Sequence, residues 1–330
     1  MDPILLCSAG LRVALTSWGA SIFYIEQQCA DDTWSRITVG DERLEDFRRN
    51  GFCFGATCGR FANRIRGGRF ELDGRVYQLA CNNGPNSLHG GDAAFHAREW
   101  IVRGIHHEDG EVRGATFHLV SPDGDGGYPG ELRVTADYRL SAEGVLSVDY
   151  SAVTDAPTVV DITNHVYWNL GGDPQRAVGD HRLMIPGARY LTIDEDHLVT
   201  GEILPVDGGD FDLRSGALLK SRLASADPQI RERRGFDHSF LIKGEGLRLV
   251  ARLEHPASGR WMEMRTDQPA VHLYTGGFLD EGTSRPRHAG LALEAGGLPD
   301  APNHPEFPVT CILRPGETYR HRAEWSFGLK

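Results

Sequence analysis

The chain has 330 residues, 40% of them hydrophobic, and a formal net charge of −11. This acidic balance argues against nucleic acid and anionic membranes as partners, because both normally require a basic face on the protein. No stretch approaches the roughly 20 apolar residues of a membrane helix, and the apolar start at Ile4 lacks the basic residues of a secretory signal. We therefore expect a cytoplasmic protein with a neutral small-molecule ligand.

The six cysteines are scattered along the chain, which does not suggest a disulfide framework. Cys53 and Cys58 are the closest pair, but four residues separate them and they lack a histidine partner in the sequence. Zinc sites normally place two cysteines closer together and add further ligands at regular spacing. We therefore expect reduced cysteines and no metal site.

In the first third of the chain, helical periodicity is confined to residues 41–49, which have room for one short helix. The dipeptide Asp73-Gly74 is a two-residue turn signal of the kind that connects antiparallel strands. It would place Phe70 opposite Tyr77 on the two strands of a hairpin.

The rest of the chain has a dominant period of two. Apolar and polar residues alternate through residues 132–152 on both sides of a short loop, which predicts a hairpin with one buried face. Residues 216–234 could hold a short helix, and residues 249–264 predict another hairpin. Forty glycines and seventeen prolines punctuate the strands, without an internal repeat or a linker-like change in composition. We expect an all-β protein, residues 1–330 forming a single large antiparallel sandwich or barrel.

Strand alternation also predicts which polar side chains share a face. His165 points away from the face that carries Trp168. His272 and Tyr274 share the polar face of their strand, and Glu294 lies on the polar face of the strand that begins at Leu291. If these faces converge, they line a groove with histidine, tyrosine and carboxylate groups.

A histidine and a carboxylate together can act as a general acid and a general base near neutral pH. A carboxylate such as Glu294 on a buried strand is costly unless it is paired or functional. Sugars need many placed donors and acceptors, and the available polar side chains are Asn63, Arg64, His89, His165, Asp237 and Glu294. Apart from Glu294, each of these residues taken singly has a structural explanation, as a turn residue, a member of a solvated ion pair or a histidine bonded to a carbonyl.

Six segments resemble the aldose 1-epimerase (galactose mutarotase) family, and they occur in family order over most of the chain. They include GRFANRIRGG and NSLHGG within residues 59–91, TNHVYWNLGG at 163–172, GFDHSF at 235–240 and LALEAGGLPD within 291–308. The resemblance implies a galactose mutarotase-like β-sandwich with a sugar cleft on one sheet, no cofactor and no metal. The expected substrate is a monosaccharide, with the protein a monomer or a homodimer.

The resemblance further implies that Glu294 is the general base and His165 the general acid of anomer interconversion. It implies sugar-hydroxyl contacts from Asn63, Arg64, His89 and Asp237. The chain departs from the family pattern at His272, where many members carry glutamine; we expect His272 to contact substrate. We also expect the neighbouring carboxylate to raise the pKa of His165, which would keep the acid protonated.

Three alternatives remain at this point. A glycoside hydrolase would use two carboxylates that flank one bond, and Asp237 and Glu294 could form that pair. A non-catalytic sugar-binding module would bind the sugar, and the anomers would interconvert only at the spontaneous rate in solvent. An epimerase of a sugar phosphate would need additional Arg or Lys at the rim of the cleft.

Overall fold

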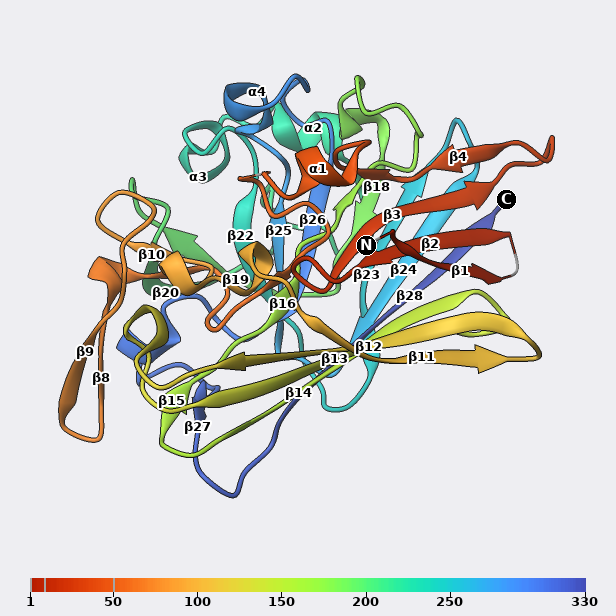
Figure 1. The fold of residues 1–330 in the computed structure, drawn as a ribbon. Coiled ribbons are helices and arrows are strands. Elements are labelled where there is room, and N and C mark those ends of the chain that lie inside the picture. The colour runs from red at the N-terminus through yellow and green to blue at the C-terminus, as the bar shows by residue number, and fades with distance from the viewer. Residues whose placement is uncertain (1, 9, 50) are drawn as a thin grey trace.

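The structure, a computed structural model, describes residues 2–8, 10–49 and 51–330. Its largest element is a nine-stranded antiparallel sheet (Figure 1). In spatial order, its strands are β11 (Ile101–Glu108), β12 (Glu111–Ser121), β13 (Leu132–Leu140), β14 (Val145–Thr154), β28 (Tyr319–Leu329), β24 (Arg260–Thr266), β23 (Arg248–His255), β18 (Arg182–Met184) and β21 (Ala217–Leu218).

A second sheet has seven strands, again paired in antiparallel fashion. In spatial order they are β20 (Val199–Pro205), β19 (Arg189–Ile193), β22 (Asp237–Leu241), β25 (Ala270–Tyr274), β26 (Leu291–Gly296), β17 (Tyr167–Trp168) and β5 (Thr38–Val39). One continuous apolar core contains residues of both large sheets, such as Val148 and Trp325 from the first and Leu273 and Leu293 from the second. The two sheets therefore form the sandwich that the sequence predicts.

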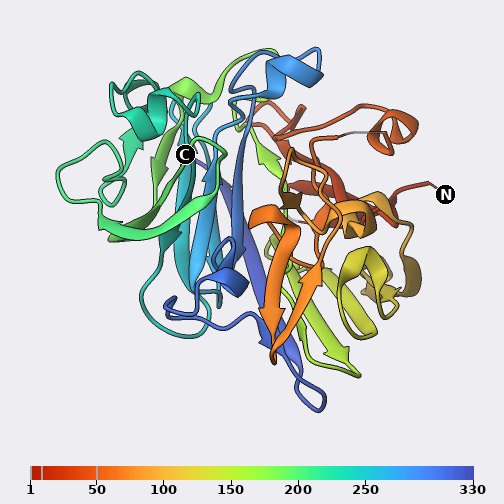
Figure 2. The same cartoon turned by 90° about the vertical axis from the view of Figure 1, so that its left-hand side faces the viewer.

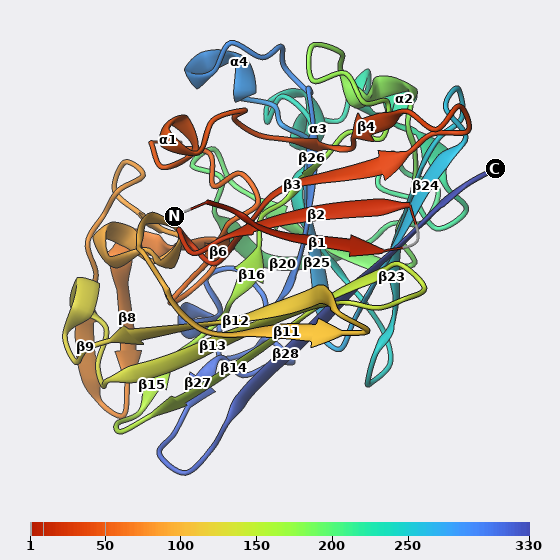
Figure 3. The same cartoon turned by 45° about the vertical axis from the view of Figure 1, so that its right-hand side comes forward.

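A four-stranded sheet at the N-terminus extends the sandwich. It consists of β1 (Ile4–Ser8), β2 (Leu11–Thr16), β3 (Ser21–Gln28) and β4 (Trp34–Arg36). Figure 3 shows these strands beside β11 and β12, and β1 packs against β12.

Short two-stranded ladders complete the strand content. They pair β6 (Thr57–Cys58) with β16 (Thr163–Asn164), β7 (Arg64–Ile65) with β10 (Ser87–Leu88), β8 (Arg69–Leu72) with β9 (Arg75–Gln78), and β15 (Thr158–Val159) with β27 (Ile312–Leu313). Figure 2 shows orange segments from the early part of the chain beside blue segments from its last third. The backbone agrees: β7 contacts the segment after β26, where the N–H of Asp300 donates to the carbonyl of Arg64 at 2.9 Å.

Helices are short and lie in connections. The α-helices are α1 (Leu44–Phe47), α2 (Leu219–Leu223), α3 (Pro228–Arg231) and α4 (Leu279–Gly282). The 3-10 helices are η1 (Arg66–Gly68), η2 (Gly91–Ala93), η3 (Phe95–Ala97), η4 (Asp125–Gly127), η5 (Val178–Asp180) and η6 (Ala301–Asn303). Among the described residues, no helix combines the length and apolar character that a bilayer crossing requires.

The predicted hairpins are confirmed. Phe70 pairs with Tyr77 across the β8–β9 turn, with ring centroids 5.4 Å apart. β13 pairs with β14, and β23 pairs with β24. The short helices predicted in 41–49 and 216–234 are also present, as α1 and as α2 with α3.

The segment around His165 differs from the single strand that the alternation suggested. It forms β16 and β17, two separate two-residue strands, with His165 in the break between them. The break arises because the two halves have different partners: β16 pairs with β6, whereas β17 pairs with β26 and β5. The predicted faces still hold, since Trp168 lies in the main core and His165 faces a pocket.

Candidate active site

One pocket gathers all seven residues that the sequence assigned to a site. Its volume of about 480 Å³ lies within the range of small-molecule sites, roughly 300–1,000 Å³. The lining combines hydrogen-bonding side chains with aromatic rings, which suits a ligand that carries both hydroxyl groups and apolar C–H faces. It consists of Gly51, Phe52, Cys53, Asn63, Arg64, Asn82, Asn83, Leu88, His89, His96, His165, Tyr167, His197, Asp237, His272, Tyr274, Phe278 and Glu294.

Three neighbouring strands of the seven-stranded sheet supply one wall of this pocket. Asp237 lies on β22, His272 on β25 and Glu294 on β26. In the antiparallel register, His272 is directly opposite Glu294, while Ser239 is opposite His272. Because alternate residues of a strand share a face, the apolar residues between them enter the core, and the polar residues point into the pocket.

His165 meets Glu294 in this pocket. Its Nε2 lies 3.4 Å from Oε1 of Glu294, and the two side chains are only 6% and 5% exposed. The backbone of His165 is fixed by two hydrogen bonds: its N–H donates to the carbonyl of Ala56, and its carbonyl accepts from the N–H of Gly55. The break between β16 and β17 thus places the imidazole of His165 next to the carboxyl group of Glu294 on β26, within reach of the same small ligand.

Burial shifts both groups of this pair towards their neutral forms. Burial, with a further contribution from the charge of Asp237, raises the pKa of Glu294 well above its ordinary value. Burial also lowers the pKa of His165. The expectation that the neighbouring carboxylate would raise the pKa of His165 is therefore wrong, because desolvation of the imidazolium outweighs the attraction.

Asp237 is held in its charged form by surrounding donors. Its Oδ1 lies 2.8 Å from Nε2 of His272, and its Oδ2 lies 2.9 Å from Nδ1 of His197. Burial favours the protonated acid, but these hydrogen bonds and the nearby Arg64 outweigh it and hold the pKa of Asp237 well below its usual range. Ser239 completes the chain, with its Oγ 2.9 Å from Nδ1 of His272.

Asn63 and His89 bond to one another in the same pocket, where Nδ2 of Asn63 lies 3.4 Å from Nε2 of His272. The N–H of His89 donates to the carbonyl of Asn63 at 3.0 Å, and the N–H of Asn63 donates to Nδ1 of His89 at 3.2 Å. Burial lowers the pKa of His89 to about 3, so the ring is neutral at physiological pH. Because Nδ1 accepts a hydrogen bond, Nε2 carries the ring proton and is a donor available to a ligand.

Gly90 permits the tight approach that positions this histidine. Its φ is +96°, and a Cβ at this position would lie 2.1 Å from the carbonyl oxygen of Gly59. Such a distance is far inside van der Waals contact, and positive φ also disfavours residues with a Cβ. The turn that carries His89 is therefore strained by any residue other than glycine at position 90.

We expect Gly90→Ala to lower the free energy of unfolding by about 1–3 kcal/mol and to raise KM, because the clash displaces the turn at His89. Gly84→Ala is the matched control: φ is +58° there, but no atom lies within 4 Å of the added Cβ. Chemical denaturation of both variants measures the difference. Equal losses in the two variants would show that backbone strain alone, and not the contact with Gly59, accounts for the effect.

Arg64 reaches the pocket from β7, next to Asn63. Its Nε donates to Oδ1 of Asn83 at 3.1 Å, and its Nη1 lies 3.7 Å from Oδ2 of Asp237. The guanidinium group therefore lies between Asn83 and Asp237, and it keeps N–H donors that a ligand can use.

Sequence reasoning missed several residues that line the pocket or, like Ser239, bond to a residue that lines it. Ser239 could have been found, because it lies two residues after Asp237 and so shares its face of β22. His197 and Asn83 lie in connections without a periodic pattern, and only the fold brings them to Asp237 and Arg64.

Side chains in and directly behind the pocket could bind a metal ion. The ligand atoms of His89, His165 and Glu294 lie within 4.8 Å of one another, and so do those of a separate group, Cys53, Cys58 and His96. The first group coincides with the acid–base pair itself.

These features define a β-sandwich protein whose polar pocket holds a buried histidine–glutamate pair. The family model for aldose 1-epimerase matches residues 2–326. The chain belongs to the aldose 1-epimerase family.

Individual relatives are similar to this chain along nearly their full length. Galactose mutarotase from Bos taurus is 42% identical over 336 aligned residues, which cover 100% of this chain and 94% of that protein. Aldose 1-epimerase from Escherichia coli K12 is 37% identical, covering 97% of this chain and 93% of that protein. The crystal structure of an aldose epimerase homologue from C. elegans superposes with a TM-score of 0.88 at 27% identity, covering 99% of each chain.

Proposed function

We propose that this enzyme, an aldose 1-epimerase, interconverts the α and β anomers of a free aldose with Glu294 as general base and His165 as general acid. One observation carries these roles: the two buried side chains lie 3.4 Å apart in a polar pocket of monosaccharide size. Asn63, Arg64, His89, Asp237 and His272 would bind the sugar hydroxyls.

In the proposed reaction, ionised Glu294 accepts the proton of the C1 hydroxyl, and protonated His165 donates a proton to the ring oxygen. The bond between C1 and the ring oxygen breaks, and the aldehyde forms. Rotation about C1–C2 exposes the other face of the carbonyl, and ring closure with reversed proton transfers gives the other anomer. Each positioned acid or base typically contributes about 10²–10⁴-fold to the rate.

The pKa shifts fit this proton inventory. Ring opening converts charged Glu294 and His165 into their neutral forms, which is the direction that burial favours for both groups. Hydrogen bonds with the C1 hydroxyl and the ring oxygen would stabilise the charged pair before the reaction begins. The burial of the pair thus favours the ring-opened state relative to an exposed pair.

The pH dependence of kcat/KM should be bell-shaped, because activity needs one proton shared by the pair. On the acid side, activity is lost when the pair binds a second proton, on His165. Burial lowers the pKa of His165 from 6.5, so we expect the midpoint of the acid limb below pH 6.5. The alkaline limb reports loss of the remaining proton from Glu294 and should lie well above pH 4.5, the ordinary pKa of glutamate. Anomer exchange measured by polarimetry, corrected for the spontaneous rate, gives the profile. An acid midpoint at or above pH 6.5 would contradict the dominance of burial.

Asp237→Asn should act mainly on sugar binding. The variant loses the charged acceptor for His272 and His197 and changes the contact with Arg64, so we expect KM to rise about 10–100-fold. We expect kcat to fall less than in a variant of Glu294. Asp196→Asn, an exposed carboxylate next to His197, is the control and should leave both constants unchanged. A large fall in kcat at unchanged KM for Asp237→Asn would instead indicate a carboxylate that takes part in the chemistry.

The hydrolase alternative requires Asp237 to be free for chemistry. Both of its oxygens instead have histidine partners, so neither oxygen is free to attack a sugar carbon or to activate a water. We therefore favour a binding role for Asp237. Incubation with a disaccharide tests the alternative directly: the proposed function predicts no release of reducing sugar.

We further propose that residues 1–330 form one galactose mutarotase-like domain and that the protein acts in the cytoplasm on a monosaccharide. The match of the family model to residues 2–326 supports the single domain. Anomer exchange on freshly dissolved α-galactose, α-glucose and α-xylose tests the activity. A rate no faster than the spontaneous one for every sugar would contradict the proposed function.

A further inference from the structure

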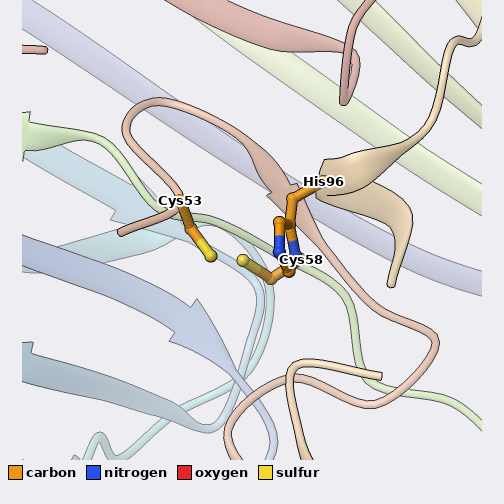
Figure 4. Close-up of side chains that lie close together, drawn as sticks. All are labelled: Cys53, Cys58 and His96. Atoms are coloured by element: carbon orange, nitrogen blue, oxygen red, sulfur yellow. The ribbon is translucent and has the colours of Figure 1, made fainter. Parts of the chain in front are cut away.

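A group of soft metal ligands lies in the wall of the pocket. The ligand atoms of Cys53, Cys58 and His96 all lie within 4.8 Å of one another. Figure 4 shows the two sulfur atoms directed towards each other, with the imidazole of His96 beside Cys58. The sequence did not reveal this group, because His96 comes from a different segment of the chain.

The backbone holds these three residues in place. Cys58 belongs to β6, which pairs with β16, and Cys53 lies in the loop before it. His96 lies in η3, where the N–H of Phe95 donates to the carbonyl of Gly59 at 3.0 Å. The ligands are therefore brought together by the fold and do not depend on a flexible terminus.

The surroundings of Cys53, Cys58 and His96 indicate that this group binds a ligand separate from the sugar. Cys53 is 6% exposed and Cys58 is fully buried, and both are free thiols. Nδ1 of His96 is buried and has no hydrogen-bond partner among the described residues. The His96 ring also hydrogen-bonds with the side chain of Cys53. Two thiols and an imidazole in such close contact form a donor set that zinc prefers over calcium or magnesium.

We propose that Cys53, Cys58 and His96 bind a zinc-like divalent transition metal ion and that its binding inhibits the enzyme. Three protein ligands leave one position of a tetrahedral zinc ion open. Cys53 and His96 line the sugar pocket, whereas Cys58 lies behind it, so the open position faces the pocket. A dication there would occupy space that the sugar needs and would repel the imidazolium form of His165.

Co²⁺ is the spectroscopic probe for this site. We expect the reduced protein to bind one equivalent of Co²⁺, with a thiolate-to-metal charge-transfer band and the strong visible bands of a tetrahedral ion. Added Zn²⁺ should displace the Co²⁺ and abolish both. A phosphine reductant keeps the thiols reduced during the titration. Absence of the charge-transfer band, or bands of an octahedral ion, would overturn the assignment of the ligands.

Cys58→Ser tests the site without altering a residue of the sugar pocket. We expect it to weaken Zn²⁺ binding by at least about 100-fold, measured by competition with a chromophoric chelator. Cys81→Ser, which removes an exposed cysteine outside the group, should bind Zn²⁺ as the unaltered chain does. These binding measurements do not depend on the sugar reaction, so their outcome is separate from that of the proposed function.

Inhibition is measured on the same variants. Zn²⁺ should suppress anomer exchange by the unaltered chain, a chelator should restore it, and Cys58→Ser should need at least about 100-fold more Zn²⁺ for the same suppression. If Zn²⁺ inhibits Cys58→Ser and the unaltered chain equally, the ion acts at His89, His165 and Glu294 instead, and the proposal is wrong.

Discussion

Replacing Glu294 with glutamine should reduce kcat for anomer exchange by about 10²–10⁴-fold while KM changes little. The amide preserves the shape of the side chain and can still bond a sugar hydroxyl, but it cannot accept the C1 proton. Because Glu294 is buried with a raised pKa, removal of its charge should also leave the folded state intact or more stable at neutral pH. Polarimetry on fresh α-galactose and a thermal melt measure the two effects.

The control for this variant is Glu143→Gln, an exposed glutamate in the loop between β13 and β14. It removes the same charge from the protein at a distance from the pocket and should exchange anomers at the normal rate. Near-normal exchange by Glu294→Gln would remove the general base from the proposed reaction.

Replacing His165 with glutamine should reduce kcat by a similar factor, about 10²–10⁴-fold, because the proposed proton donor to the ring oxygen is lost. The two variants should differ in their pH profiles. In His165→Gln only Glu294 titrates, so the remaining activity should rise with pH as the carboxylate forms. In Glu294→Gln only His165 titrates, so the remaining activity should fall with pH as the imidazolium is lost.

These opposite single limbs distinguish catalytic roles from structural ones. A histidine that only supported the pocket would leave the bell shape intact at a lower amplitude. His107→Gln, which alters an exposed histidine on β11, is the matched control and should keep the full rate and both limbs.

Local strand geometry could be read from the sequence because a period of two determines which residues share a face. The pairing of Phe70 with Tyr77 and the hairpin of β13 and β14 were predicted from turn residues and alternation alone. The order of the strands in the two large sheets could not be predicted, because β28 at the C-terminus inserts between β14 and β24. Such long-range pairings depend on packing, and no local pattern records them.

The site shows the same division. Alternation placed His272 and Glu294 on polar faces, and the register confirms that they lie directly opposite one another. The break at His165 was missed, because it results from a change of strand partner between β16 and β17. The pKa of His165 was also misjudged, because the neighbouring carboxylate could be expected from the family resemblance but the depth at which His165 is buried could not.

The structure of Glu294→Gln with bound galactose tests the central claim most directly. We predict that the C1 hydroxyl lies within hydrogen-bond distance of the side chain at residue 294 and that the ring oxygen lies next to Nε2 of His165. A sugar that is bound with C1 turned towards Arg64 and Asp237, beyond the reach of both groups, would contradict the account.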